Sequence, residues 1–591
     1  MRKLPFLIAA IICFVLFGLT LNYGWGYTET FYVCQGGDGT LPETDACSTA
    51  WDAEDVNTGG NWAATNTDDT KIGPNDIVYV KDDGGNITYG AGNGVFDAQN
   101  SGLSGEPITF KNYPGDTPVL DGGSARLSGM IIYQRSYITL DGLTIQNGAT
   151  YGVYAVGAQN GIVIQNCTIE GDSIGVQYYN NSASDQAGMN FIDNNVTGTG
   201  DWGITIYSDN GGDIQSPIIT GNTVASGAGA TSGAIGVVGG GGSSITGTLT
   251  ITGNTITSAG GYGVFVDVEG GGSVTATTAI SNNTITNWSQ TTGDRAGIHL
   301  IGFANNTVIV ENNVLTGGGT QYDSAGIYMD GGAGWTSVTA HVRYNYIHDI
   351  EGFGVLMYLA DSVKVYNNII ENTCNDDSNA LRGQIVILSG AADTANTNEI
   401  YNNTIYLDVN TENVYGIQIV ANGGSVAGNI IKNNIIYHDA AAGYDYIYNG
   451  ADATADIDYN LYWPVIGNTE MHYNGTDYNS FSLWQAASHD ANGVEADPLF
   501  SDAANGDFTL QSTSPAIDAG INLGASYDDV LHPDSTWPDS VITVDQDSFG
   551  SGWEIGAYVY VFYKLIRTHV NTGTIQPCFP RIVCPSVNMN T

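Results

Sequence analysis

The chain has 591 residues, with 60 acidic and 15 basic side chains, a formal net charge of −45 and 80 glycines. Binding to nucleic acid or to an anionic membrane depends on lysine and arginine that neutralise phosphates, so this charge argues against both partners. The 42% hydrophobic and 10% aromatic residues are enough to form a core, which argues against disorder. These features indicate a large, glycine-rich β protein.

Residues 1–26 have the composition of a secretory signal peptide. Two basic residues precede an apolar run from Leu4 to Leu21, and small residues permit cleavage after Gly26. The run is nearly long enough to span a bilayer, so an uncleaved N-terminal anchor is the alternative. In both cases we expect a secreted or bacterial cell-surface protein.

The cysteines fit an oxidising compartment. Cys34 and Cys47 are close enough in sequence to predict a local disulfide. Cys167 and Cys374 stand alone and lack the spacing of zinc ligands, so we interpret them as small hydrophobic residues.

Residues 126–465 form an internal repeat. An asparagine followed by β-branched or aliphatic residues recurs about every 29 residues, and a glycine followed by an aliphatic residue recurs between these asparagines. Alternation of period two occurs throughout, without apolar residues at helical spacing. The asparagines are Asn166, Asn195, Asn222, Asn254, Asn283, Asn313, Asn345, Asn368, Asn403, Asn434 and Asn460.

A unit of this length cannot bury its apolar face alone. Stacked coils can, because inward aliphatic residues then form one core and each strand pairs in parallel with its counterpart in the next coil. The recurring asparagine suits a turn, since it tolerates the left-handed conformation and its amide can bond to the equivalent asparagine one coil away. We therefore predict an all-β parallel solenoid of about ten or eleven coils, roughly 50 Å long at about 4.8 Å per coil.

The segment from Phe31 to Tyr462 resembles the right-handed parallel β-helix superfamily, the pectate-lyase-like fold. The resemblance implies that residues 27–125 form the N-terminal cap and the first coil. The superfamily contains lyases, hydrolases, epimerases, adhesins and surface proteins, so the resemblance implies a fold rather than an activity. The motifs that carry it at this end are Gly73–Val80, Gly105–Phe110, Pro114–Gly122 and Ile138–Leu143.

Residues 466–560 depart from the repeat. They are similar to the closing module of bacterial surface β-helix proteins known as the choice-of-anchor Q type, which implies a C-terminal β module that caps the last coil. Residues 561–591 contain no acidic residue, and we expect either a surface-attachment tail or an unstructured basic end. The motifs of the closing module are Asp497–Phe500, Asp507–Leu510, Ser514–Gly520 and Glu554–Tyr558.

The strands that follow the repeated glycines predict an aromatic outer face. If the residue next to each glycine points inward, the residues two and four positions after the glycine point outward. Tyrosine rings can stack on sugar rings while their hydroxyls bond to sugar hydroxyls, which fits a site for an extended glycan. The alternative is that tyrosine is simply favoured on an outer β surface and covers neighbouring loops. The candidate substrate-binding residues are Tyr154, Tyr179, Tyr207, Phe265, Tyr328 and Tyr358, with Arg295 just ahead of one strand.

Asp267, His299 and Asp330 fall on three consecutive coils of this face. Two coils place the Cα atoms of the two aspartates about 10 Å apart, within reach of the roughly 6.5–9.5 Å carboxyl separation of an inverting glycosidase. His299 between them could hold or transfer a proton. The alternative is that two carboxyls share a face by chance in a very acidic chain.

A lyase would instead need a base, for which His299 is the candidate, and a cation that stabilises the carbanion. Basic residues are scarce, so an acidic glycan would be bridged by Ca²⁺ on Asp267, Glu269 and Asp330. The sequence itself requires no cofactor. We expect a monomer whose partner is an extracellular polysaccharide, and the alternative function is a non-catalytic adhesin or structural envelope protein.

Overall fold

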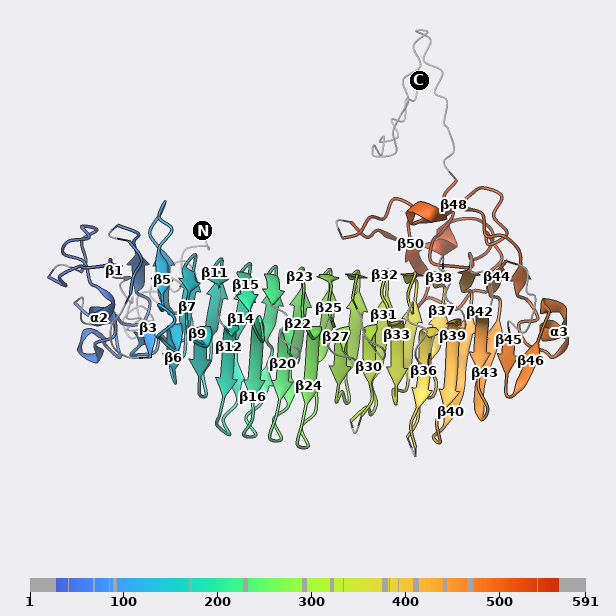
Figure 1. Cartoon of the computed structure of the whole chain (residues 1–591), viewed down its shortest axis with the longest axis horizontal. Helices are drawn as coiled ribbons and strands as arrows, with labels where there is room; N and C mark the ends of the chain where they lie inside the picture. Colours follow the sequence, from blue (N-terminus) through green and yellow to red (C-terminus); the bar gives the residue numbers. More distant parts are fainter. Residues whose placement is uncertain are drawn as a thin grey trace, which may run out of the picture.

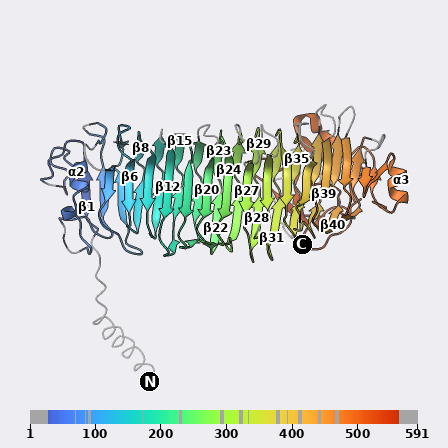
Figure 2. The same ribbon diagram turned by 60° about the horizontal axis from the view of Figure 1, so that its bottom comes forward.

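The structure is a computed structural model that describes residues 28–562, with short gaps. The predicted signal segment 1–26 and nearly all of the tail 561–591 lie outside the described residues. The described chain forms a rod whose coils follow one another in sequence order (Figure 1), and a second view shows the same stacking from another side (Figure 2). The gaps fall at residues 41, 67, 69, 84, 89–92, 171–172, 227–231, 290–294, 319–323, 333, 375–380, 382, 392, 408–413, 439–443, 465–470 and 539.

From β4 onward each coil contributes one strand in turn to three long sheets, which we name sheets 1, 2 and 3 in the order in which a coil passes through them. Neighbouring strands within a sheet are parallel, apart from the final pair of sheet 3. Sheet 1 has 15 strands: β1 (Thr30–Val33), β2 (Ile77–Val80), β4 (Ile108–Asn112), β7 (Ile138–Asp141), β10 (Ile162–Gln165), β14 (Asn190–Ile192), β18 (Ile218–Thr220), β22 (Thr248–Thr252), β25 (Thr277–Ser281), β28 (Thr307–Glu311), β31 (Thr339–Arg343), β34 (Val363–Tyr366), β37 (Glu399–Tyr401), β40 (Val426–Lys432) and β43 (Ala453–Asp458).

Sheet 2 has 14 strands: β5 (Val119–Asp121), β8 (Thr144–Gln146), β11 (Thr168–Glu170), β15 (Asn195–Thr199), β19 (Thr223–Ser226), β23 (Thr255–Thr257), β26 (Thr284–Thr286), β29 (Val314–Thr316), β32 (Tyr346–His348), β35 (Ile369–Glu371), β38 (Thr404–Leu407), β41 (Ile435–His438), β44 (Leu461–Trp463) and β47 (Val494–Glu495). Sheet 3 has 15 strands: β3 (Gly94–Ala98), β6 (Ser128–Tyr133), β9 (Tyr151–Val156), β12 (Ile174–Asn180), β16 (Ile204–Ser208), β20 (Gly233–Gly239), β24 (Tyr262–Val268), β27 (Ala296–Ile301), β30 (Ala325–Asp330), β33 (Phe353–Tyr358), β36 (Gly383–Ser389), β39 (Val414–Ala421), β42 (Tyr444–Asn449), β45 (Met471–Tyr473) and β46 (Thr476–Tyr478).

The remaining elements are short. No helix among the described residues is long and apolar enough to cross a membrane. The small elements are the α-helices α2 (Ala53–Val56) and α3 (Phe481–Ala486), the 3-10 helices η1 (Gly59–Asn61), η2 (Ala503–Asn505) and η3 (Gln546–Ser548), and the strands β13 (Gln186–Ala187), β17 (Ile214–Gln215), β21 (Ile245–Thr246), β48 (Phe500–Asp502), β49 (Asp507–Leu510), β50 (Asp529–Leu531) and β51 (Thr543–Asp545).

The parallel β-helix predicted from the repeat is confirmed, and it is longer than the ten or eleven coils expected. The difference arises at the N-terminal end, where β1, β2 and β4 precede the first repeated asparagine yet pair in parallel with the later coils. The recurring asparagine occurs only in coils that have the same turn between sheets 1 and 2. Counting asparagines therefore underestimates the length.

The core consists of the inward side chains that alternate with outward ones along each strand. In β24, Val264 and Val266 are fully buried, while Phe265 between them points to the outer face and stays partly exposed. The glycine before Val264 cannot carry a side chain, because a Cβ on Gly263 would lie 2.5 Å from the carbonyl oxygen of Gly297 in the next coil. Removing each such aliphatic side chain from water contributes about 1.5–3 kcal/mol.

A buried asparagine ladder runs along the turn between sheets 1 and 2. Asn254 donates its side-chain amide to Asn283 Oδ1 in the next coil and to the Ile219 carbonyl, both at 3.0 Å. The amide bond between coils was predicted correctly, but the left-handed conformation belongs to the residue before each ladder asparagine, such as Gly253 at φ 66°. The ladder residues are Asn194, Asn222, Asn254, Asn283, Asn313, Asn345, Asn368, Asn403, Asn434 and Asn460.

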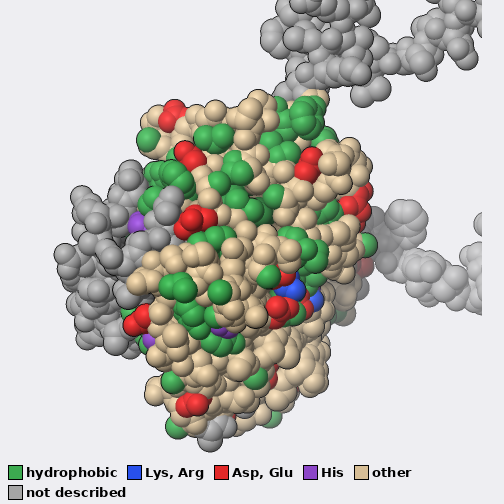
Figure 3. All heavy atoms as spheres, turned by 90° about the vertical axis from the view of Figure 1, so that its right-hand side faces the viewer, with side chains coloured by type: hydrophobic (Ala, Val, Ile, Leu, Met, Phe, Trp, Pro, Cys, Tyr) green, Lys and Arg blue, Asp and Glu red, His purple; other side chains and the backbone are tan. Residues whose placement is uncertain are grey.

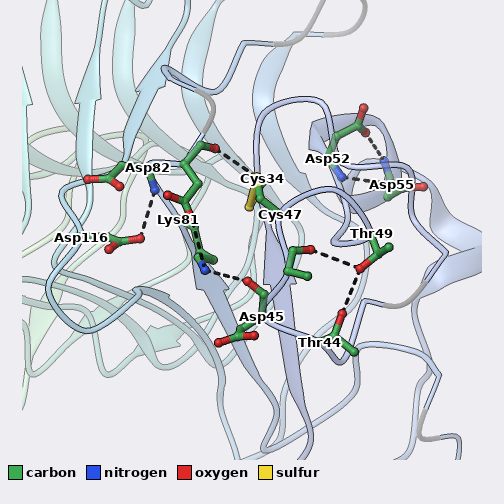
Figure 4. The surroundings of a disulfide bond; sticks show 12 residues. Cys34, Thr44, Asp45, Cys47, Thr49, Asp52, Asp55, Lys81, Asp82 and Asp116 are labelled. Atoms are coloured by element: carbon green, nitrogen blue, oxygen red, sulfur yellow. Dashed lines mark hydrogen bonds and ion pairs between the residues drawn. A yellow bond between two sulfur atoms is a disulfide. The ribbon is translucent and has the colours of Figure 1, made fainter.

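A disulfide and a small polar network hold the N-terminal end together (Figure 4). Cys34 and Cys47 are joined in a disulfide with their Cα atoms 5.4 Å apart. Beside it, Lys81 Nζ donates to the Asp45 carbonyl oxygen at 2.7 Å. These contacts link β1 and β2, the first two strands of sheet 1, to the loop that carries Cys47.

The C-terminal region covers both the end and one side of the rod. The hairpin β45–β46 and helix α3 close the end, where Trp484 is fully buried. Residues 497–562 do not cap the last coil, as the closing-module resemblance implied, but lie along sheet 2 (Figure 1). Tyr344 donates its hydroxyl to the Asp529 carbonyl at 2.9 Å, and Asn402 donates to the Glu554 carbonyl at 3.0 Å. Seen from the C-terminal end, charged side chains are scattered among neutral ones (Figure 3).

Candidate functional site

Sheet 3 presents two columns of outward side chains along the rod. In the first column, Gln177 pairs with Tyr154 and with Thr205, and farther along His299 pairs with Phe265 and with Tyr328. These residues stand two positions after the repeated glycines, so the structure places them as the alternation predicted.

The second column holds the residues four positions after the glycines. Tyr179 pairs with Tyr207 in one part, and Asp330 pairs with Ile301 and with Tyr358 in another. Asp267 also belongs to this column. Phe265 pairs with His299 on the next strand, so Asp267, two residues after Phe265, is level with Ile301, which pairs with Asp330. The two carboxyls therefore share one column, with one coil between them.

His299 lies in the first column at the level of that intervening coil. Its ring stacks on Tyr328, with centroids 4.2 Å apart and planes at 11°, and meets Phe265 edge-on at 5.7 Å. Its Nε2 lies 3.7 Å from Asp330 Oδ2, while its side chain is 5% exposed. Two aromatic neighbours thus hold the imidazole beside the Asp330 carboxyl.

The carboxyl of Asp267 holds its proton to a higher pH than an ordinary aspartate does. The residue is only 8% exposed, and burial raises its pKa to about 6, with further contributions from the negative charges of Glu269 and Asp330. A carboxyl with such a pKa is typical of a general acid. The site therefore combines one carboxyl of raised pKa and a second carboxyl beside a histidine.

Arg295 lies at the start of the strand that carries His299. Its Nη1 donates to the Tyr262 hydroxyl at 2.7 Å, and its guanidinium lies 4.6 Å from the centre of the Tyr262 ring. Tyr262 also stacks on Phe265 at 4.2 Å. The sequence analysis missed Tyr262 because it stands before the glycine, where the outward alternation is interrupted; an aromatic residue at that position was the available signal.

The remaining aromatic candidates form a second group toward the N-terminal end of sheet 3. Tyr179 stacks on Tyr207 at 5.6 Å and donates its hydroxyl to Asp209 Oδ2 at 2.5 Å. That hydrogen bond to a carboxylate raises the pKa of Tyr179 to about 12. Tyr154 stacks on Tyr151 at 4.2 Å. These rings are partly exposed and leave faces that can contact a ligand.

The predicted calcium ligands are not gathered into a cluster. Among the described residues, the group of acidic side chains whose oxygens all lie within 4.8 Å of one another is Asp528, Asp545 and Asp547, in the C-terminal segment. The carboxylate oxygens of Asp267, Glu269 and Asp330 are not all within 4.8 Å of one another. The three residues therefore form no preformed calcium cluster in the part of the chain that the structure describes.

Comparisons with known proteins address the fold. A family model described as the right handed beta helix region matches residues 57–224, 210–405 and 266–460. The uncharacterized protein YwoF of Bacillus subtilis (strain 168) is 28% identical over 206 residues, which are 33% of this chain and 41% of that protein. The match thus spans less than half of the length of that relative.

Several solved structures match this chain at low similarity. A rhamnogalacturonan lyase matches with 16% identity over 57% of this chain and 87% of its own, at a TM-score of 0.36. Pectate lyase Pel9A matches with 13% identity over 90% and 97% of the two chains, at a TM-score of 0.27. The A-module of the Azotobacter vinelandii mannuronan C-5 epimerase AlgE6 matches with 12% identity over 74% and 89%, at 0.29. Likenesses at this level do not bear on activity.

Proposed function

The chain belongs to the right-handed β-helix family, and from that premise we propose that it binds an extracellular polysaccharide along the outer face of sheet 3 and cleaves it between Asp267 and Asp330. The observation that carries the proposal is the pair of carboxyls in one outward column, of which Asp267 has a pKa raised to about 6. Aromatic rings lie on the same two strands as this pair: Tyr262 and Phe265 on β24, and Tyr328 on β30.

The carboxyls take different roles because their surroundings differ. Asp267, buried and repelled by Glu269, keeps its proton to a higher pH than an ordinary aspartate and donates it to the leaving glycosidic oxygen. Asp330, 19% exposed and 3.7 Å from His299, accepts a proton from the attacking water. His299 orients Asp330 and stabilises its negative charge. Tyr328 and Phe265 contact the sugar rings and exclude water from the bond that breaks.

The test is an incubation of the purified chain with a panel of neutral and uronic polysaccharides, with and without Ca²⁺. New reducing ends report hydrolysis, and an added rise in absorbance near 235 nm reports the unsaturated product of a lyase. We expect Asp330→Asn to lower the rate at least 100-fold, as loss of a general base does, with an unchanged melting temperature.

A matched control removes a carboxyl elsewhere. Asp456 lies on sheet 1, is 62% exposed and pairs with Lys432, so Asp456→Asn should leave the rate unchanged. Silence in both readouts for the whole panel would contradict cleavage. Retention of the chain by a glycan-containing gel in that case would indicate a non-catalytic surface protein.

We also propose that the chain is exported, on the basis of the basic and apolar start of the sequence and the disulfide between Cys34 and Cys47. Immunodetection in the culture medium and on the cell surface of an expressing bacterium, against a variant that lacks residues 1–26, tests this. Equal cytoplasmic retention of both forms would contradict export.

A further inference from the structure

A pocket hollows the face of sheet 3 at its N-terminal end. Its volume is about 530 Å³, and side chains from the first strands of the sheet and the turns after them line it. Asp97 lies on β3, Tyr133 on β6 and Tyr154 on β9, while Arg135 follows β6 and Asn181 follows β12. The proposed catalytic pair lies outside this lining.

The pocket lies in line with the candidate site along sheet 3. Asp97 pairs with Ile131, and Ile131 pairs with Tyr154, which places all three in the column that continues to His299. Four strand steps separate β9 from β24, the strand of Asp267, so the distance along the rod is about 19 Å. An extended glycan long enough to cover this distance would contact both places.

Arg135 is the unusual member of the lining. Its Nε is buried without a hydrogen-bond partner, and its guanidinium forms no ion pair with the part of the chain that the structure describes. Asp97 is close enough for the positive charge of Arg135 to act on its pKa, which burial raises, but no salt bridge joins the two. A buried guanidinium nitrogen without a partner is costly, and the chain contains only 15 basic residues. The rest of the Arg135 side chain stays partly exposed in the pocket lining, where an anionic group can pair with the guanidinium.

We propose that this pocket binds an acidic sugar unit of the polysaccharide, with Arg135 pairing with its carboxylate or sulfate group. The inference rests on the proposed function, because it places the unit on the same glycan that the carboxyl pair cleaves. Tyr133, whose residue is 51% exposed, and Tyr154 offer ring faces for the sugar. Asp97 and Asn181 offer hydrogen bonds to its hydroxyls.

The test measures binding by calorimetry, with the full chain carrying Asp330→Asn so that the probe stays intact. The probes are hexagalacturonate, which carries carboxylates, a sulfated κ-carrageenan hexasaccharide and neutral cellohexaose. We expect one acidic probe to bind more tightly than cellohexaose, which identifies the anionic group. Adding Arg135→Gln should weaken that binding at least tenfold and leave cellohexaose unaffected. Tyr133→Ala should weaken binding with an unchanged melting temperature, since the ring is exposed.

Lys71→Gln is the matched control, because it removes one positive charge from a side chain that is 41% exposed and outside the pocket. It should change the affinity less than twofold. Unchanged affinity in Arg135→Gln, an equal loss in Lys71→Gln, or no preference for either acidic probe would overturn the proposal. Cleavage that persists while Arg135→Gln has no effect contradicts the pocket alone, whereas binding that depends on Arg135 without any cleavage contradicts the catalytic proposal alone.

Discussion

Sheets 2 and 3 both carry outward aromatic side chains, but among the described residues the C-terminal segment packs on those of sheet 2, whereas several on sheet 3 stay partly exposed. On sheet 2, Tyr406 is 4% exposed and its ring contacts Phe508 of the C-terminal segment, with centroids 5.1 Å apart. Tyr437 contacts Phe500 of the same segment at 6.0 Å. These aromatic residues form a second hydrophobic core between the rod and residues 497–562.

On sheet 3 the outward rings stay partly exposed. Tyr179 and Tyr207 stack on each other, and Tyr328 stacks on His299, yet none of these three tyrosines is buried. An outward aromatic residue in a β-helix can therefore pack against another segment of the chain or contact a ligand. Which of the two it does depends on whether another segment covers it. A ring that stays partly exposed can contact a ligand. The comparison predicts opposite effects of substitution on the two sheets.

The largest effect on stability is expected from the covered side. Phe508 is 1% exposed within the core beneath the C-terminal segment. Phe508→Ala should lower the free energy of unfolding by about 3–5 kcal/mol and expose residues 497–562 to limited proteolysis. Denaturant unfolding and protease digestion followed by mass spectrometry measure both. A loss below about 1 kcal/mol would mean that this side is not a packed core.

The next effect concerns the end of the asparagine ladder, where a carboxyl takes the place of an amide. Asp490 Oδ2 accepts from Asn460 Nδ2 at 3.1 Å and from the Tyr462 hydroxyl, and burial raises its pKa to about 7. The folded chain then binds this proton more tightly than the unfolded chain, so the free energy of unfolding falls as the pH rises from about 4 to about 7. Asp490→Asn should flatten that dependence and add about 2 kcal/mol at pH 8. Melting temperatures at pH 5 and pH 8 measure it, and an unchanged slope would contradict the raised pKa.

A smaller stabilisation is expected from the site itself. The pKa of Asp267 is also raised, to about 6, so its contribution likewise falls as the pH rises from about 4 to about 6. Asp267→Asn should add about 1 kcal/mol at pH 8 while abolishing cleavage, as expected for a carboxyl kept for function at the expense of stability. Asp490→Asn is the control, because it changes the pH dependence of stability without touching the groove. Loss of stability in Asp267→Asn would indicate a structural role.

The sequence predicted the features that repeat in every coil. The glycines and the alternation after them placed Asp267, His299 and Asp330 on one face, because strand periodicity and coil-to-coil pairing are local rules. Two of the predicted asparagines were one residue out of register. Asn194 rather than Asn195 belongs to the ladder, and Asn166 is the left-handed residue before Cys167, which takes the ladder position.

Features that depend on contacts between distant residues were not predictable. The position of the C-terminal segment depends on contacts such as Tyr406 with Phe508, which no repeat encodes. The stacking of His299 on Tyr328 and the pocket beside Arg135 depend on rotamers and on turns outside the strands. The chemistry-bearing residue types were visible in the sequence, but their mutual geometry was not.

The most direct test of the central claim compares one tyrosine from each sheet. Tyr207→Ala on sheet 3 and Tyr437→Ala on sheet 2 remove the same side chain from outward positions, both partly exposed. Retention in a gel containing the polysaccharide that binds the parent chain, measured with the melting temperature of each variant, separates binding from folding. We expect Tyr207→Ala to lose retention at an unchanged melting temperature, and Tyr437→Ala to keep retention at a lowered one. Retention that survives in Tyr207→Ala, or is lost equally in both, would contradict a glycan-binding face on sheet 3.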